Sequence, residues 1–272
     1  MSRFLITALC LSLLFVSACQ APRFTPIGPV AESAPNAPRS EPTEESPRII
    51  LAECERFRLF YPEPFCELMP LEEVLRRTLL GFAQVEHFLG EFRQQIDIYV
   101  ALKIQPSDPD FPDNLVIQGL TFENEGRIVV FISLLYADPG TYAHEFTHAR
   151  LRDLKVNPPR WLEEGLAHFN DYPDGFNPEL YKILCAEGPL SPEVLNSDGD
   201  VDSLEMQRRA TGWAVAYYLL KVKGCSFEQV ATLARSLEPA EAVAAVKLAA
   251  AARNSTPESG ATVVATASEG NR

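Results

Sequence analysis

Histidine, tryptophan and methionine are all scarce in this chain of 272 residues, which has four, two and three of them. Positive charge is scarce as well, because 37 acidic residues face 24 basic ones and give a formal net charge of −13 at pH 7. Such a chain lacks the basic surface that binds a phosphate backbone, so we expect no nucleic-acid partner. The same deficit argues against docking on an anionic membrane surface through charge.

The chain also lacks an apolar run long enough to cross a membrane near its N-terminus. Residues 4–16 form an apolar run of thirteen residues, whereas a membrane-spanning helix needs about 20. A short run after a basic start is typical of a signal peptide. The sequence VSAC at 16–19 resembles the lipobox of bacterial lipoproteins, so we expect residues 1–18 to be a lipoprotein signal peptide and Cys19 to carry a lipid anchor. An ordinary secretory signal cut after Ala18 is the alternative.

The segments that flank the central part of the chain lack apolar periodicity. Residues 19–48 contain seven prolines and read as a disordered, extended tether, and residues 253–272 read as a disordered tail. One domain, residues 49–252, remains between them. We expect an exported, membrane-anchored protein on the periplasmic face of the outer membrane, because Gln20 lacks the aspartate that retains some lipoproteins at the inner membrane. No feature indicates an oligomeric state.

Closely spaced cysteine pairs are absent, which argues against a zinc site built from cysteine. Apart from Cys10 in the signal and Cys19, four cysteines remain, and an even number in an exported protein favours two disulfides. Their count leaves three pairings open. We expect a pair that closes a short proline-containing loop and a pair that joins two helices, which are Cys54–Cys66 and Cys185–Cys225.

Two of the four histidines stand together in the sequence His144-Glu145-Phe146-Thr147-His148. Residues four apart on a helix lie about 40° apart around its axis, one turn above each other, so both imidazoles can reach one metal ion. Glu145 lies about 100° round from the first histidine, where it can take a proton from water without binding the metal. The motif H-E-x-x-H therefore predicts zinc ligands His144 and His148, with Glu145 as general base.

A candidate for the third ligand follows in the sequence Trp161-Leu162-Glu163-Glu164-Gly165. Here the chain resembles the gluzincin branch of zinc metallopeptidases (a peptidase MA-like domain), in which a W-L-x-E-G-[FL]-A helix supplies a glutamate ligand. The resemblance covers about residues 95–236. It implies one Zn²⁺ held by His144, His148 and Glu164, with a fourth position open. Glu164 is preferred to Glu163 because it directly precedes Gly165, as the ligand does in the family.

The same resemblance suggests further site residues. Several gluzincins orient a ligand histidine with a carboxylate one turn after the glutamate ligand, and this chain has His168 there. His168 is left with several roles, namely to accept a hydrogen bond, to donate to an oxyanion, to bind the metal or merely to line the helix. Asp171 is a second candidate for the orienting carboxylate. Related enzymes donate to the oxyanion from a downstream Tyr or His, and the candidates here are Tyr217 and Tyr218, with Tyr142 a third.

Strand patterns come first in the domain and helical patterns second, which predicts an α+β fold. Strands are expected at 96–100, 115–122 and 127–132, with a hairpin turn at 123–126. Helical spacing predicts helices at 70–89, 141–154, 160–170, 177–186, 203–222, 227–237 and 239–251. The resemblance implies a small, mostly antiparallel sheet packed on the H-E-x-x-H helix, followed by a helical C-terminal subdomain (a zincin-like fold). Strand 115–122 would be the edge that pairs with an extended substrate.

Residues 119–124 read Gly-Leu-Thr-Phe-Glu-Asn, in the region where zinc aminopeptidases of this branch carry G-x-M-E-N. The glutamate of that motif binds the amino terminus of the substrate. One extra residue separates the glycine from Glu-Asn here, and the methionine is absent. An exopeptidase activity through Glu123 therefore stays open as an alternative to an endopeptidase.

Together these patterns predict a zinc-dependent peptidase that hydrolyses peptide bonds with metal-activated water. Its partners would be a peptide or protein substrate and, through the lipid on Cys19, a membrane. The alternative is a non-catalytic lipoprotein that uses a metallopeptidase-like fold as a binding or assembly module. The intact H-E-x-x-H favours the enzyme, because a module that needs only the fold has no use for Glu145.

Overall fold

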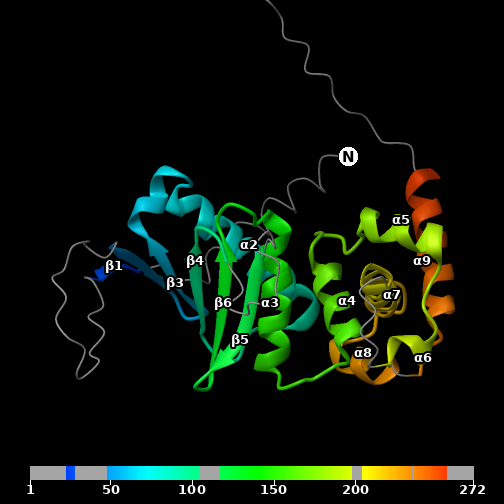
Figure 1. Cartoon of the computed structure of the whole chain (residues 1–272). Helices are drawn as coiled ribbons and strands as arrows, with labels where there is room; N and C mark the ends of the chain where they lie inside the picture. Colours follow the sequence, from blue (N-terminus) through cyan, green and yellow to red (C-terminus); the bar gives the residue numbers. More distant parts are fainter. Residues whose placement is uncertain (1–22, 28–47, 105–116, 198–203, 235, 256–272) are drawn as a thin grey trace, which may run out of the picture.

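The computed structural model describes residues 23–27, 48–104, 117–197, 204–234 and 236–255. They form an α+β fold, which confirms the predicted fold class (Figure 1). The predicted signal peptide, Cys19, most of the tether and nearly all of the tail lie outside the described residues. Within the part of the chain that is described, no helix combines the length and the apolar composition needed to cross a membrane.

Six strands form one mixed sheet in the order β1-β2-β3-β4-β6-β5. Their bounds are Arg23–Ile27 (β1), Ile49–Glu53 (β2), Phe57–Pro62 (β3), Ile96–Ala101 (β4), Gly119–Asn124 (β5) and Arg127–Ser133 (β6). The outer pairs β1/β2, β2/β3 and β5/β6 are antiparallel, whereas β3/β4 and β4/β6 are parallel. Three of the five strand pairs are thus antiparallel, as expected, but the parallel centre was not expected. β3 and β4 are parallel because the connection through α2 crosses back to the end where β3 began, and β6 is parallel to β4 because the antiparallel edge strand β5 comes between them in the chain.

The first three strands were not predicted. β1 lies inside the segment expected to be an unstructured tether, and it pairs along its full length with β2 at the edge of the sheet. β2 and β3 form a hairpin in the region that we had expected to be a disulfide-closed loop. The domain therefore begins earlier, in structural terms, than the predicted boundary at residue 49.

Neither predicted disulfide forms. Cys54 lies in the turn between β2 and β3, and Cys66 lies in the 3₁₀-helix η1 (Glu63–Glu67) beyond the far end of β3. Six residues of strand separate the ends of β3 by about 20 Å, so the two thiols point from opposite ends of a hairpin. Cys185 is exposed on its helix, and Cys225 is half-buried. Among the described residues no two cysteine sulfurs lie at disulfide distance, which contradicts both pairings.

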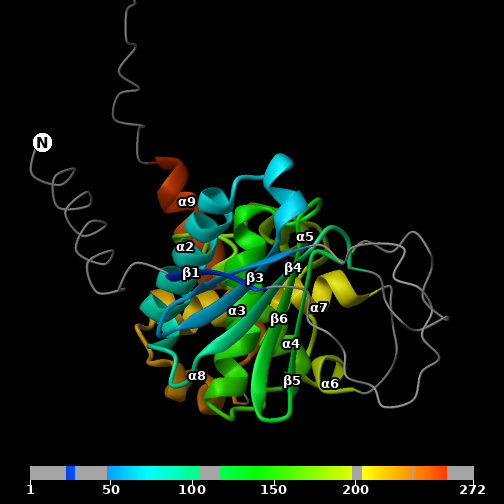
Figure 2. The same cartoon turned by 90° about the vertical axis from the view of Figure 1, so that its left-hand side faces the viewer.

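Two helices, α2 (Leu71–Leu89) and α3 (Pro139–Asp153), cover one face of the sheet (Figure 2). Leu59, Ile98 and Val130 stand side by side on β3, β4 and β6 and are fully buried under these helices. Phe82 of α2 and Phe146 of α3 meet above them with ring centroids 4.4 Å apart. Each such buried side chain contributes about 1.5–3 kcal/mol, so this core fixes α3 against the sheet.

The opposite face of the sheet carries an aromatic ladder. Phe60, Tyr99, Phe131 and Phe122 stack across β3, β4, β6 and β5, with ring centroids 4.4 to 5.8 Å apart and rings nearly parallel. Cross-strand aromatic pairs fix the register of a sheet. Because successive side chains alternate between faces, a Phe122 in this ladder turns its neighbour Thr121 toward α3.

β5 and β6 form the predicted hairpin with a tighter turn than expected. The strands pair up to Asn124 and Arg127, so only Glu125 and Gly126 remain in the turn. Their φ angles of 50° and 78° are left-handed at both central positions, which is typical of a type I′ turn. β5 begins at Gly119 and forms the edge of the sheet.

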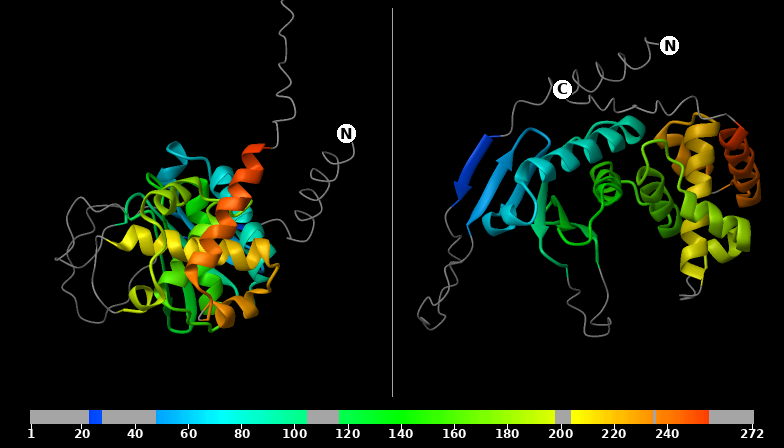
Figure 3. Two further views of the ribbon diagram at one scale, coloured as in Figure 1. Left: turned by 90° about the vertical axis from the view of Figure 1, so that its right-hand side faces the viewer. Right: turned by 90° about the horizontal axis from the view of Figure 1, so that it is seen from above.

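The remaining helices form a second layer beyond α3 (Figure 3). They are α4 (Arg160–Asn170), α5 (Pro178–Glu187), α6 (Pro192–Leu195), α7 (Glu205–Tyr217), the π-helical turn η3 (Tyr218–Val222), α8 (Phe227–Leu233) and α9 (Pro239–Ser255). α4 and α7 cross at Gly165 and Gly212, where backbone meets backbone. A Cβ atom on Gly212 would lie 2.0 Å from the carbonyl oxygen of Trp161, so only glycine permits this approach.

Candidate metal centre

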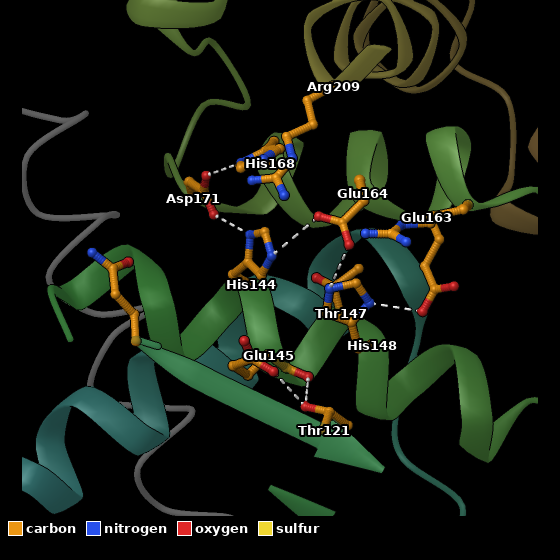
Figure 4. A network of polar contacts seen from close by, with 12 residues as sticks. Thr121, His144, Glu145, Thr147, His148, Glu163, Glu164, His168, Asp171 and Arg209 are labelled. Atoms are coloured by element: carbon orange, nitrogen blue, oxygen red, sulfur yellow. Dashed lines mark hydrogen bonds and ion pairs between the residues drawn. The ribbon is translucent and has the colours of Figure 1, made fainter. Parts of the chain in front are cut away.

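The H-E-x-x-H segment lies in the middle of α3, whose start is fixed by a capping box. The Asp138 carboxylate accepts a hydrogen bond from Thr141 N at 2.8 Å, and Thr141 Oγ1 accepts one from Asp138 N at 3.2 Å. Such a cap sets where the helix begins. His144 and His148 then lie one turn apart on the face of α3 that looks toward α4, and Figure 4 shows both rings turned toward Glu164.

The structure brings together the three predicted metal ligands. Glu164 Oε2 lies 3.8 Å from His144 Nε2, and Glu164 Oε1 lies 3.9 Å from His148 Nε2. All three ligand atoms lie within 4.8 Å of one another. Two ligand atoms that lie about 2.0–2.1 Å from one tetrahedral zinc ion are about 3.3 Å apart, so each of these two histidine–glutamate distances would shorten by about half an ångström on metal binding. Two imidazoles and one carboxylate are also the donor set of several catalytic zinc sites.

A carboxylate holds the far side of each ligand imidazole. His144 Nδ1 lies 3.1 Å from Asp171 Oδ1, and His148 Nδ1 lies 2.8 Å from Glu163 Oε1. These oxygens accept the Nδ1 protons, which leaves the Nε2 lone pairs directed at a common centre. Glu163 therefore orients His148 instead of binding the metal, and Asp171 does the same for His144. The donor set fits a divalent metal ion such as zinc.

His168 is part of this hydrogen-bonded shell. Its Nδ1 lies 2.7 Å from Asp171 Oδ2, so one carboxylate bridges His144 and His168 (Figure 4). The ring packs edge to face on His144, with centroids 4.8 Å apart. His144, His168 and Asp171 also have ligand-type atoms within 4.8 Å. Asp171 holds His168 through Nδ1 only, and His168 Nε2 is buried without a hydrogen-bond partner among the described residues. His168 therefore contacts His144 through Asp171 and retains a second ring nitrogen that could bind a metal ion or donate a hydrogen bond.

The carboxylates shift the proton affinities of the site in the metal-free chain. Burial lowers the pKa of His144, but the hydrogen bond to Asp171 and the charges of Asp171, Glu145 and Glu164 outweigh it and raise that pKa to about 9. Burial raises the pKa of Asp171, but hydrogen bonds from His144 and His168 outweigh it and lower that pKa to about 2. The hydrogen bond from His148 lowers the pKa of Glu163. The site therefore holds ionised carboxylates over a wide pH range.

The predicted general base Glu145 is buried between α3 and the edge strand β5. Thr121 Oγ1 lies 2.6 Å from Glu145 Oε2 and 3.1 Å from the Glu145 carbonyl oxygen. Gly119 leaves the space that the side chain fills, because a Cβ atom there would lie 2.3 Å from Glu145 Cγ. Neither contact was predicted from the sequence. The signal that could have indicated them is that Gly119 and Thr121, two residues apart on one strand, lie on the same face.

A cleft of about 990 Å³ opens over these residues. One wall is formed by residues 117–121 leading into and along β5, and the other by α4 and the first turns of α7. The first turn of α3 and the start of α5 close one end. The side chains of His144, Glu145, His148, Glu164 and His168 line it, and so does Arg209 of α7, which the sequence analysis did not single out.

The residues expected to donate to an oxyanion do not line this cleft. Tyr217 is buried against Phe169, Phe176 and Trp213, and the Tyr218 hydroxyl donates to the Glu241 carboxylate. Tyr142 is buried in the core under the sheet. Glu123 is also outside the cleft lining, beyond the last contact of β5 with the site. Helical spacing predicts that these tyrosines lie on a packed face of their helix, but it cannot tell whether that face meets the core or the cleft.

Comparison of the chain with protein-family models, with curated proteins and with solved structures finds no match.

Proposed function

We propose that this protein is a zinc-dependent peptidase of the gluzincin type, lipid-anchored through Cys19 on the exported side of a bacterial membrane. One observation carries the proposal. The Nε2 atoms of His144 and His148 face Glu164 across 3.8–3.9 Å with each Nδ1 held by a carboxylate, and a buried Glu145 adjoins them in an open cleft. Metal ligands, outer carboxylates and a base in one cleft are the parts that metal-assisted hydrolysis needs.

The residues would share the work as follows. His144, His148 and Glu164 would hold a zinc ion, which would supply the positive charge that lowers the pKa of water and polarises a carbonyl. Glu145 would accept a proton from the attacking water and deliver it to the leaving amine. Asp171 and Glu163 keep the two imidazoles in the tautomer that presents Nε2.

The edge of the sheet offers a way to hold the substrate. β5 is the last strand in the sheet order, and its first residues border the cleft. An extended peptide laid along this edge would form main-chain hydrogen bonds and bring its carbonyls over the metal ligands. This arrangement favours an endopeptidase over an aminopeptidase, because Glu123, the candidate for binding a free amino terminus, lies outside the cleft lining.

The test combines metal analysis with the variant Glu145→Gln. We expect about one zinc per chain in the parent and in the variant, because Glu145 is not a ligand. Cleavage of a broad peptide library should fall by about a hundredfold to ten-thousandfold in the variant, since general-base catalysis contributes 10²–10⁴-fold. Glu228→Gln, at an exposed carboxylate on α8 outside the cleft lining, is the matched control and should change neither zinc content nor cleavage.

Zinc bound without any Glu145-dependent cleavage would favour the alternative, a non-catalytic module on the same fold. A protein that binds no stoichiometric metal would refute both readings of the site. The anchor is tested separately, because Cys19→Ser should release the protein from the membrane fraction while its zinc content stays unchanged.

A further inference from the structure

Arg209 comes to the cleft through the close crossing of α4 and α7. Gly212 touches the backbone of α4 at Gly165, and Arg209 lies three residues earlier, on the same face of α7. On α4, Glu164 precedes the contact point and His168 follows it one turn later. Figure 4 shows the side chain of Arg209 descending from α7 beside His168. The same glycine pair that brings Glu164 to the metal centre therefore brings a guanidinium into the cleft.

The guanidinium of Arg209 is hydrogen-bonded through Nε alone. Arg209 Nε donates to Glu205 Oε1 at 3.0 Å, one helical turn away. Among the described residues, Nη1 and Nη2 of Arg209 have no hydrogen-bond partner. Arg160, at the start of α4, approaches the same Glu205 oxygen at 3.9 Å and is 80% exposed. At this wall of the cleft, two guanidinium groups share a single carboxylate.

The acidic side chains that line the cleft are, in contrast, all engaged. Asp138 caps α3, Asp171 holds two histidines, and Glu179 pairs with Lys182 at 2.8 Å. Glu163 is shared by His148 and Arg152, and Glu164 faces the metal centre. At the α7 wall, Arg209 and Arg160 have only the Glu205 carboxylate between them, so one of these two positive charges is not compensated there.

We propose that Arg209, supported by Arg160, forms a subsite for a carboxylate of the substrate. The inference rests on the proposed function, because it places the subsite beside the proposed catalytic centre. Its test measures peptide binding and does not require cleavage. A guanidinium fixed at Nε presents Nη1 and Nη2 as a planar fork, which binds the two oxygens of a carboxylate. That carboxylate comes from an Asp or Glu side chain or from the C-terminus of the peptide. The protein would thus select peptides that are acidic on the α7 side of the scissile bond.

The experiment measures binding to the full-length, zinc-loaded Glu145→Gln variant, so that peptides stay intact. The probes are fluorescent alanine-rich hexapeptides that carry Glu, Gln or Lys at each position in turn, with either an amidated or a free C-terminus. Hydrogen bonds to charged groups predict roughly tenfold tighter binding of the best Glu peptide than of its Gln counterpart. A preference for the free C-terminus over the amide, without a Glu preference, would identify the terminal carboxylate as the source.

Substitutions at the subsite locate the preference. Arg209→Gln should abolish the carboxylate preference, and Arg209→Lys should retain a part of it, because the charge stays while the fork is lost. Arg160→Gln should reduce it less, since this side chain is more exposed. Arg76→Gln, on α2 and remote from the cleft, is the matched control and should leave the preference unchanged. Zinc content verifies that each variant is folded at the site.

Two results would overturn the subsite. The first is equal binding of Glu, Gln and free-terminus peptides by the zinc-loaded protein. The second is a carboxylate preference that persists in Arg209→Gln with full zinc content. A parent that binds acidic peptides through Arg209 but cleaves none of them would instead refute the peptidase and keep the subsite, so the two failures are distinguishable.

Discussion

The two helices that build the candidate metal centre are held in place by different means. α3 packs on the sheet through the apolar core, and directional polar contacts then set its position, such as the Asp138 cap at its start and the 2.6 Å contact between Thr121 and Glu145 in its middle. α4 is fixed on the helical side by steric contact, because Gly165 and Gly212 let the backbones of α4 and α7 meet. The position of the proposed base therefore depends on a hydrogen bond, and that of the proposed third ligand depends on the absence of a side chain.

The two sides are joined directly by a few polar contacts. Asn170 of α4 is fully buried and donates to Thr147 Oγ1 of α3 at 2.9 Å. Asp171, at the end of α4, holds His144 of α3. These contacts align the two halves of the site, and their disruption should affect metal binding more than folding.

The largest expected effect is the pH dependence of zinc binding, which involves the contact between His144 and Asp171. Because the pKa of His144 is raised to about 9 in the metal-free chain, a proton must leave before the metal binds at lower pH. The apparent zinc affinity should fall about tenfold per pH unit below 9, or roughly a hundredfold between pH 8 and pH 6. Competition with a chromophoric chelator measures it.

The raised pKa of His144 has the opposite effect on the stability of the metal-free protein, because low pH weakens zinc binding but favours the folded state. A folded-state pKa above the ordinary value of 6.5 means that protonated His144 stabilises the fold fully below pH 6.5, and that this contribution is lost as the pH rises through 9. In Asp171→Asn the pKa of His144 should fall, so the pH dependence of zinc binding should begin at a lower pH. An unchanged onset in this variant would contradict the role of Asp171.

The steric side is tested by Gly212→Ala. The added carbon would lie 2.0 Å from the backbone oxygen of Trp161, and a backbone atom cannot move aside as a flexible side chain can. We expect a loss of about 3 kcal/mol in the free energy of unfolding, at the upper end for overpacking, together with weakened zinc binding as Glu164 moves away. Chemical denaturation and zinc titration measure the two effects.

Gly188→Ala is the control for this substitution. Gly188 has a φ of 77° and a ψ of 178°, a conformation nearly exclusive to glycine, but open space around it, so the added methyl group should cost about 1–3 kcal/mol through backbone strain alone. Zinc affinity should stay at the parental value. Equal effects of the two substitutions on zinc binding would show that the crossing of α4 and α7 does not position Glu164.

The polar side is tested by Gly119→Ala on β5. The new Cβ atom would lie 2.3 Å from Glu145 Cγ and would displace the carboxylate. A catalytic group displaced by about 1 Å can lower the rate about a hundredfold, so kcat should fall by about that factor while zinc content is retained. Asn124→Ala, on the same strand but exposed and outside the cleft lining, should leave kcat within about twofold of the parent. Parental kcat in Gly119→Ala would contradict the buried position of the base.

The smallest expected effect isolates one hydrogen bond. Thr121→Val removes the hydroxyl from Glu145 at nearly constant volume, and Thr121→Ser keeps the hydroxyl. A hydrogen bond to a charged group contributes about 1.5–3 kcal/mol, so kcat should fall roughly tenfold or more in the Val variant and remain near the parental value in the Ser variant. KM and zinc content should not change in either, since Thr121 contacts the base and not the metal ligands. A loss of the same size in both variants would point to packing instead.

The parts of the site that the sequence could predict are local in the chain. The ligand histidines and the base lie within five residues, and Glu164 follows in a short motif, so helical geometry alone places them on usable faces. Thr121 and Arg209, which the sequence did not indicate, reach the same cleft from a strand and from a third helix. Their meeting depends on how the elements pack, which residue spacing does not encode.

The same limit explains the errors in the fold. Ile49–Glu53 is short and ends beside a cysteine, and we interpreted the region as a disulfide loop because the cysteine count was the stronger pattern. The alternation of buried Phe57, Leu59 and Tyr61 was a period-two signal that could have predicted β3. Parallel pairing in the centre of the sheet could not be predicted from any single strand, because it depends on how the connections between strands run.

The crossing of α4 and α7 has a mechanical consequence. Two rods that touch through bare backbone have no side-chain rotamers to absorb a displacement, so they can roll about the point of contact more easily than they can separate. Because α4 and α7 together form the cleft wall that faces β5, a change in the angle between these two helices changes the shape of that wall. Because Glu164 and Arg209 lie next to this pivot, they travel little during such a roll, whereas the outer ends of both helices sweep through larger arcs and set the width of the entrance.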